Sequence, residues 1–194
     1  MSNVVGRPVP LFMDVDGALL AYPADTSEAD PRLRTARLDL DFPDDPSYPT
    51  RIWFDPEVVA GLNRLVDEGL VQLIWASTWD RAANRLLVPA IGLLGGPYDV
   101  AEIGTRYGDQ MAAGIWIKTL AVGRWLQENG LQGAPIVMVD DLLTNQASGF
   151  MSPQRRSIDV VGGDPNLFIA TQPKRGLHVE QVAEVRAFAE RIAR

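Results

Sequence analysis

A pair of carboxylates near the N-terminus has a spacing that suits catalysis or metal binding. Asp14 and Asp16 follow the apolar run Val9–Met13, and Gly17 comes directly after them. Residues i and i+2 of an extended chain point the same way, so both carboxylates can face one site, and the glycine lets the backbone turn sharply. Such an Asp-x-Asp-Gly cluster is also typical of turns and of calcium loops, although a calcium loop needs more spaced oxygen ligands than follow here.

A second acidic pair, Asp140 and Asp141, directly follows the apolar run at residues 136–139. If both runs are strands of one parallel sheet, the two pairs lie at the same edge of that sheet, where open α/β folds bind their ligands. Like charges brought together in this way repel each other unless a cation neutralises them. Carboxylate oxygens without a nearby His or Cys favour Mg²⁺, whereas a helix-capping role would explain only one residue of the pair.

Two further positions could complete an anion site. Ser77 and Thr78 follow the apolar run at residues 71–76 and precede a helical pattern, so either hydroxyl could bind a phosphate oxygen or simply cap the helix. Lys118 begins another helical pattern, and it is one of only two lysines in a chain that otherwise uses arginine. A compact ammonium there could offset phosphate and carboxylate charge, whereas Lys174, the other lysine, is expected on a loop surface.

The rest of the chain supplies the elements that must position these residues. Apolar runs alternate with helical patterns, which predicts a parallel sheet covered on both faces. The expected strands are Val9–Met13, 71–76, 98–103, 136–139 and Leu167–Ala170. The first expected helix has Asp55 as its N-cap and ends before Gly69, and the second follows Asp80 and ends near Pro89. Two more helices have the apolar stripes Ile117, Leu120, Ala121 and Trp125, and Val182, Val185, Ala189 and Ile192.

The segment at about residues 18–54 is rich in proline and has no convincing helical pattern. Alternation at residues 36–42 and at Arg51–Phe54 predicts a β-hairpin that projects from the sheet. Because this insert is small, we expect residues 1–194 to form a single domain with a flap or cap.

Composition narrows the classes of function. The formal charge of −7 disfavours sequence-independent attachment to nucleic acid or anionic lipid. The absence of cysteine excludes disulfides, thiolate nucleophiles and cysteine-based zinc sites. No apolar run is long enough for a signal-peptide core or a bilayer span, so we expect a cytoplasmic protein that does not bind membranes.

In chain order, the motifs Asp14/Asp16, Ser77, Lys118 and Asp140/Asp141 resemble the four-motif signature of the haloacid dehalogenase (HAD) superfamily. The resemblance spans nearly the whole chain. It implies an α/β, three-layer Rossmann-like fold with five parallel strands in the order 5-4-1-2-3. The loop at residues 173–177 and the tryptophan-containing second motif are also similar, more weakly, to HAD phosphatase domains associated with RNA repair.

The resemblance also implies a role for each motif. Asp14 would be the nucleophile that forms an aspartyl-phosphate, and Asp16 the acid that protonates the leaving oxygen and later activates water. Family dehalogenases lack this second acid and transport ATPases carry Thr there, which leaves a phosphatase or a phosphotransferase. Ser77 or Thr78, together with Lys118, would hold the phosphoryl group. Mg²⁺ would be bound by Asp14, Asp16 through its backbone carbonyl, Asp140 and Asp141.

The expected partner is a phosphorylated substrate, either a small molecule or the end of a nucleic acid or protein, and no obligate protein partner is indicated. A catalytically silent phosphate- or nucleotide-binding module on the same fold is the alternative, and the intact nucleophile and acid favour the enzyme. The five tryptophans are expected to pack in the core, with Trp79 the best candidate for an exposed base-stacking ring. His178 is expected to face solvent at the start of the last helix.

Overall fold

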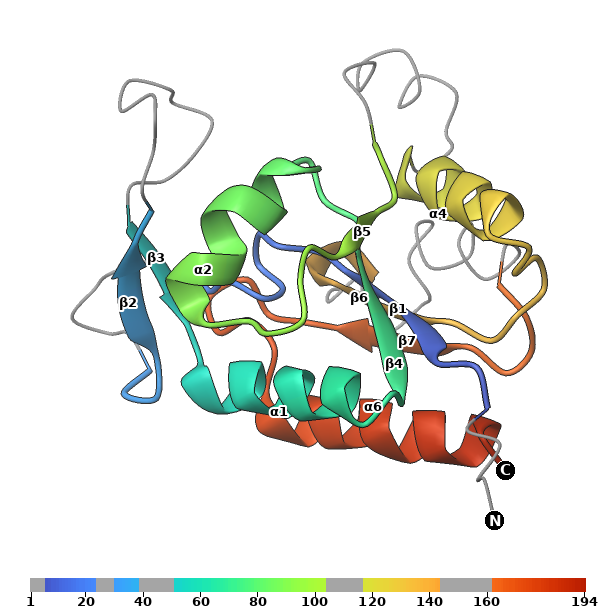
Figure 1. Cartoon of the computed structure of the whole chain (residues 1–194). Coiled ribbons are helices and arrows are strands. Elements are labelled where there is room, and N and C mark those ends of the chain that lie inside the picture. The colour runs from blue at the N-terminus through green and yellow to red at the C-terminus, as the bar shows by residue number, and fades with distance from the viewer. Residues whose placement is uncertain (1–5, 24–29, 39–50, 104–116, 144–161) are drawn as a thin grey trace, which may run out of the picture.

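The computed structural model describes residues 6–23, 30–38, 51–103, 117–143 and 162–194. Its centre is a parallel sheet of β1 (Val9–Met13), β4 (Val71–Trp75), β5 (Asp99–Val100), β6 (Val137–Asp140) and β7 (Leu167–Ala170). The strands lie in the order β5-β4-β1-β6-β7 (Figure 1). These labels differ from the expected order 5-4-1-2-3 because the numbering includes the hairpin strands β2 and β3. When only the five strands of the sheet are numbered along the chain, their order from β7 to β5 is 5-4-1-2-3.

Alternate residues of the central strands face two separate apolar clusters. Leu11 of β1 lies beside Leu73 and Val137, and all three join the cluster formed with α1 (Pro56–Asp67) and α6 (Val179–Ile192). Phe12 instead joins the cluster formed with α4 (Ile117–Glu128). Figure 1 shows α1 and α6 together on one side of the sheet and α4 on the other, so the fold has three layers.

The first helix has the boundaries that the sequence predicts. Asp55 is its N-cap and accepts a hydrogen bond from the Glu57 amide at 2.9 Å, Pro56 is its first residue, and the helix ends at Asp67. Gly61 on this helix lies against α6, where a Cβ atom would come within 2.8 Å of a Val182 methyl group. The close contact between α1 and α6 therefore depends on a small residue at this position.

Two helix predictions need correction. The second helical run begins with a π-helical segment, Ala83–Leu87, and continues through Pro89 in α2 (Val88–Ile91), whose C-cap is Gly92. Pro89 is compatible with α2 because it lies in the first turn of this helix, where the amide groups have no acceptor within the helix. In α4, Leu120 is 39% exposed rather than buried with the other three residues of its predicted stripe.

A small antiparallel hairpin, β2 (Arg34–Arg37) and β3 (Arg51–Phe54), lies beside the sheet (Figure 1). The prediction of a hairpin is confirmed, although residues 39–42 of its first predicted strand lie outside the described part of the chain. Ile52 and Phe54 of β3 are buried in the core, and the Ala21 amide donates to the Trp53 carbonyl at 2.9 Å. The hairpin is thus tied to the segment that follows β1.

No helix within the described ranges is long and apolar enough to cross a membrane.

Candidate active site

Three carboxylates meet where β1 and β6 end. Asp14 follows β1, Asp140 is the last residue of β6, and Asp141 comes next. One carboxylate oxygen from each residue lies within 4.8 Å of the other two. Asp14 is 6% exposed, Asp140 is fully buried and Asp141 is partly buried. The two acidic pairs of the sequence therefore converge, because their strands are neighbours in the sheet.

Lys118 lies between two of these carboxylates. Its Nζ is 2.8 Å from Asp14 Oδ1 and 2.5 Å from Asp140 Oδ2, and its side chain is buried. The other oxygen of Asp140 accepts the Leu142 amide hydrogen at 2.8 Å. If all three carboxylates are ionised, the single ammonium leaves two negative charges uncompensated within this group of four side chains.

Burial perturbs the protonation of the whole cluster. It raises the pKa of Asp14 to about 7, with the charge of Asp140 adding to the effect and the charge of Lys118 opposing it. Burial likewise raises the pKa of Asp140 and of Asp141. For Lys118, burial alone would lower the pKa, but the charges of Asp14 and Asp140 outweigh it and raise the pKa. Additional positive charge at the site would therefore favour the ionised form of all three carboxylates.

The donor set fits Mg²⁺, which prefers hard oxygen ligands and usually takes few of them from the protein. The backbone around the cluster is also adapted to it. Gly17 has a φ of +71°, and a Cβ atom there would come within 2.8 Å of Asp141 Oδ2. A side chain at this position would displace the Asp141 carboxylate, so the glycine of the first motif makes room for the third carboxylate.

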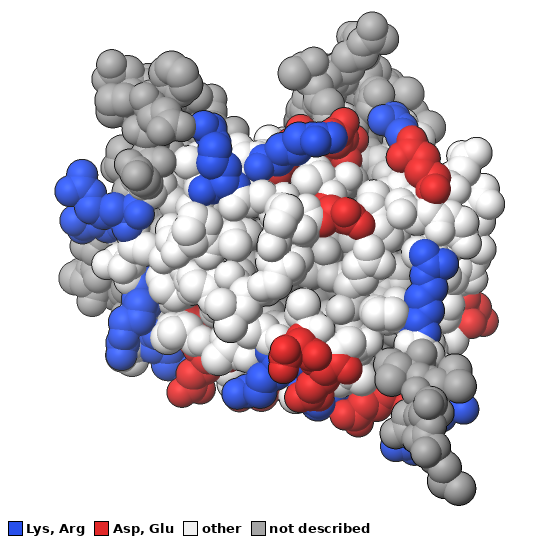
Figure 2. Space-filling model, viewed as in Figure 1, with Lys and Arg blue, Asp and Glu red and all other residues white. Residues whose placement is uncertain are grey.

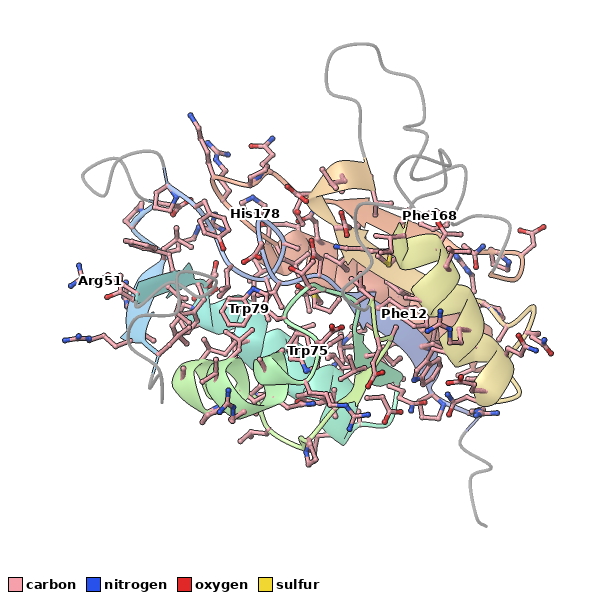
Figure 3. The ribbon with its side chains drawn as sticks, turned by 90° about the horizontal axis from the view of Figure 1, so that it is seen from above. Phe12, Arg51, Trp75, Trp79, Phe168 and His178 are labelled. Atoms are coloured by element: carbon pink, nitrogen blue, oxygen red, sulfur yellow. The ribbon has the colours of Figure 1, made fainter. Side chains whose placement is uncertain are left out.

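The side chain of Asp16 makes a separate set of contacts. One of its oxygens accepts a hydrogen bond from the Tyr22 hydroxyl, and the other accepts one from Trp79 Nε1 at 3.0 Å. Trp79 is only 3% exposed, so the prediction that it offers an exposed stacking ring is wrong. Figure 3 shows it between Trp75 and the hairpin that carries Arg51. Neither contact with Asp16 could be read from the sequence, because neither donor has a characteristic spacing from it.

The two hydroxyls after β4 have different surroundings. Ser77 is 1% exposed, and its Oγ accepts the Trp79 amide hydrogen at 3.4 Å. Thr78 is exposed. The turn that follows is held by the carboxylate of Asp80, which accepts the Ile103 amide hydrogen at 3.0 Å. Within the second motif, Ser77 is therefore buried in the core, whereas Thr78 is exposed to solvent.

The loop after β7 supports the backbone of the first motif. Thr171 Oγ1 donates to the Gly17 carbonyl at 2.8 Å, and the Leu177 amide donates to the Ala18 carbonyl at 2.7 Å. Sequence reasoning missed Thr171, which has no motif of its own. Lys174 is exposed, as expected. His178 is the N-cap of α6 but is only partly exposed, and its Nδ1 lies 3.0 Å from Arg32 Nη2.

Comparison with known families agrees with this arrangement. Residues 10–182 match the family model described as the HAD domain in Swiss Army Knife RNA repair proteins. The chain belongs to this HAD family. A search of curated proteins found no match. HAD domains are generally hydrolases or phosphotransferases and typically use Mg²⁺, and the acidic cluster of this HAD domain could bind such an ion.

Proposed function

We propose that this HAD domain is a Mg²⁺-dependent phosphate-ester hydrolase in which Asp14 attacks phosphorus. The observation that carries the proposal is the convergence of Asp14, Asp140 and Asp141 at the end of the sheet, with Lys118 bridging two of them. Asp16 lies two residues from the proposed nucleophile and outside the carboxylate cluster. This separation leaves its carboxyl group available for proton transfer.

Asp14, Asp140, Asp141 and the backbone carbonyl of Asp16 would hold Mg²⁺, which supplies the positive charge that lets an anionic carboxylate approach an anionic phosphate. In the first step an Asp14 oxygen bonds to phosphorus while the bond from phosphorus to the leaving oxygen breaks. Asp16 gives its proton to that oxygen. In the second step water attacks phosphorus and gives a proton to Asp16, while the bond between Asp14 and phosphorus breaks and phosphate is released.

Lys118 and Ser77 are the side chains that we propose to hold the phosphoryl group. Lys118 already has its ammonium at the nucleophile, 2.8 Å from Asp14 Oδ1. Ser77 Oγ accepts a backbone amide, and among the described residues no acceptor is recorded for its own proton. That proton can therefore be donated to a phosphate oxygen. We favour Ser77 over Thr78 because the Thr78 side chain faces outward.

We propose phosphorylated RNA ends as the first substrates to test, because the matching family is described from RNA repair proteins. Figure 2 shows a largely uncharged centre on the described part of one face, with basic and acidic side chains both present near its edges. A mixed surface of this kind attracts a polyanion only weakly, which favours recognition of a phosphate end by the site itself. Small phosphate esters and phosphopeptides are the competing substrate classes, and both are included in the test.

The direct test is a phosphate-release screen with Mg²⁺ across p-nitrophenyl phosphate, nucleotides, sugar phosphates, RNA and DNA ends and phosphopeptides. We expect release from p-nitrophenyl phosphate, loss of that release with EDTA, and the highest kcat/KM on an RNA end. A faster reaction with free sugar phosphates or mononucleotides would contradict the RNA assignment. Binding of phosphate esters without any release would favour the silent binding module instead.

Stability should depend jointly on pH and Mg²⁺. Asp14 has a pKa of about 7 in the folded protein and an ordinary value of 3.8, so the folded state binds more protons between these pH values. Without Mg²⁺, this group should therefore make the protein less stable as pH rises through that window, by on the order of a few kcal/mol. Bound Mg²⁺ offsets the repulsion, so its addition should raise Tm more at pH 8 than at pH 5.

The measurement is thermal unfolding at the two pH values, with KCl at matched ionic strength as the control for screening. An equal effect of Mg²⁺ and KCl at pH 8 would contradict a specific site for the ion.

A further inference from the structure

We propose that Trp79 and Tyr22 are positioning residues for Asp16, and that their hydrogen bonds aim its carboxyl group at the leaving oxygen. The inference rests on the proposed phosphatase function. It gives a role to two side chains, Trp79 and Tyr22, to which the four-motif resemblance assigns none, and it gives the two oxygens of Asp16 different roles.

Both oxygens of Asp16 have donors from separate parts of the chain. The Tyr22 hydroxyl, six residues further along, contacts Oδ1, and Trp79 Nε1, which follows β4, contacts Oδ2 at 3.0 Å. A carboxyl group held on both oxygens cannot rotate freely about its terminal bond. Holding a catalytic group in its productive orientation is worth a large part of its effect on rate.

The two donors are themselves anchored. The Tyr22 amide donates to the Pro173 carbonyl at 2.7 Å, which ties this residue to the loop after β7. The Trp79 amide donates to Ser77 Oγ at 3.4 Å, its carbonyl accepts the Ala82 amide at 2.9 Å, and its ring is buried. Asp16 is therefore oriented by contacts from two segments of the chain, one that follows β1 and one that follows β4. Tyr22 itself is 40% exposed.

The chemistry of the two donors differs. An indole N–H can only donate, so the Asp16 oxygen facing Trp79 acts as an acceptor whether or not the carboxyl group is protonated. A phenolic hydroxyl can donate to a carboxylate or accept from a carboxylic acid. The transferable proton is thus directed to the oxygen on the Tyr22 side. Trp79 thus determines which oxygen of Asp16 carries the proton. The Tyr22 hydroxyl can stay hydrogen-bonded to that oxygen before and after proton transfer.

A purely structural role would explain the same bonds, because a buried indole usually needs a hydrogen-bond partner. The two explanations differ in their dependence on the leaving group. A well-aimed acid matters for an alkyl phosphate, whose leaving alkoxide is a poor leaving group. It matters little for p-nitrophenyl phosphate, whose leaving group departs without a proton.

The decisive variant is Trp79→Phe, which keeps an aromatic ring and removes the donor. General-acid catalysis contributes roughly 10²- to 10⁴-fold, so we expect kcat/KM for an alkyl phosphate to fall by about 10- to 100-fold. The value for p-nitrophenyl phosphate should change by less than about threefold. Because kcat/KM reports the steps through departure of the leaving group, the later water attack does not obscure the comparison.

Trp75→Phe is the matched control. Trp75 is also a buried indole, but its Nε1 donates to Asn84 Oδ1 at 3.1 Å and not to Asp16. This control should slow both substrates to a similar extent, if at all. Tyr22→Phe offers an independent variant at a more exposed position, and we expect the same preferential loss on alkyl phosphates.

A double-mutant comparison completes the test. In an Asp16→Asn background, adding Trp79→Phe should cause little further loss on the alkyl phosphate, because there is no acid left to aim. Equal losses on both substrates for Trp79→Phe and Tyr22→Phe, in an otherwise active enzyme, would overturn the positioning role and leave the phosphatase proposal intact. Inactivity of the wild-type protein on every phosphate ester would overturn the phosphatase proposal itself.

Discussion

Asp14→Asn is expected to reduce phosphate release by roughly 10⁴-fold or more, the size of loss seen when the central residue of a catalytic group is removed. The amide has nearly the shape of the carboxylate but cannot act as the nucleophile. Asp14 is buried beside Lys118 and the Asp140/Asp141 pair, so no neighbouring carboxylate can take over from the same position. The measurement is the initial rate of release from p-nitrophenyl phosphate with saturating Mg²⁺.

The control for this variant is a measurement of whether the Asp14→Asn protein is still folded. Lys118 keeps Asp140 as a partner at 2.5 Å, and the substitution removes one of three mutually repelling carboxylates. We therefore expect the Asp14→Asn protein to stay folded in thermal unfolding. A folded variant that retains a tenth or more of the wild-type rate would contradict nucleophilic attack by Asp14.

Lys118→Met is expected to lower the free energy of unfolding by about 3–5 kcal/mol at pH 8 without Mg²⁺, the cost of removing one partner from a buried ion pair. The substitution leaves Asp14 and Asp140 buried together without their shared cation. Turnover should also fall, by roughly 10²- to 10³-fold, because a charge that stabilises the transferring phosphoryl group is lost. Urea denaturation and initial rates measure the two effects.

The destabilisation should depend on pH in a defined direction. Burial raises the pKa of Asp14 and of Asp140, so lowering the pH allows both to take up protons and relieves their repulsion. The loss from Lys118→Met should therefore be smaller at pH 5 than at pH 8. Lys118→Arg keeps the charge and should recover part of the stability. Wild-type stability for Lys118→Met at pH 8 would show that the buried carboxylates are not held by this lysine.

Much of the candidate site could be predicted from the sequence because it depends on strand ends. Asp14 and Asp140 follow apolar runs that form neighbouring parallel strands, and such strands end at the same edge of a sheet. The first helix was equally predictable, because Asp55 and Pro56 act through local hydrogen bonding and backbone geometry. These predictions needed only the local sequence and the rule that parallel strands of one sheet end at the same edge.

The features that could not be predicted depend on contacts between distant segments. Trp79 was the best candidate for a stacking residue, yet its ring is buried in the apolar core and its indole nitrogen donates to Asp16, 63 positions away in the sequence. Leu120 fits a helical stripe, but α4 turns it toward the surface. Periodicity describes one helix at a time, whereas burial depends on which neighbours cover it.

We expect the proposed active site to lower the stability of the metal-free protein. Three carboxylates share one buried lysine, and burial raises the pKa of each carboxylate. A protein selected only for stability would replace one of them with a neutral residue. Gly17 and Thr171 also support this arrangement, one by leaving space for Asp141 and the other by holding the Gly17 carbonyl. In the proposed mechanism, relief of this repulsion would favour binding of Mg²⁺.

The most direct test of the proposed chemistry is to trap the phosphorylated protein. Wild-type protein is mixed with excess p-nitrophenyl phosphate and Mg²⁺, quenched in acid during turnover, digested and sequenced by tandem mass spectrometry. We predict a phosphoryl group on Asp14 that hydroxylamine removes and that is missing from the Asp14→Asn protein. Rapid phosphate release from the wild-type protein with the phosphoryl group on another residue, and none on Asp14, would contradict this account.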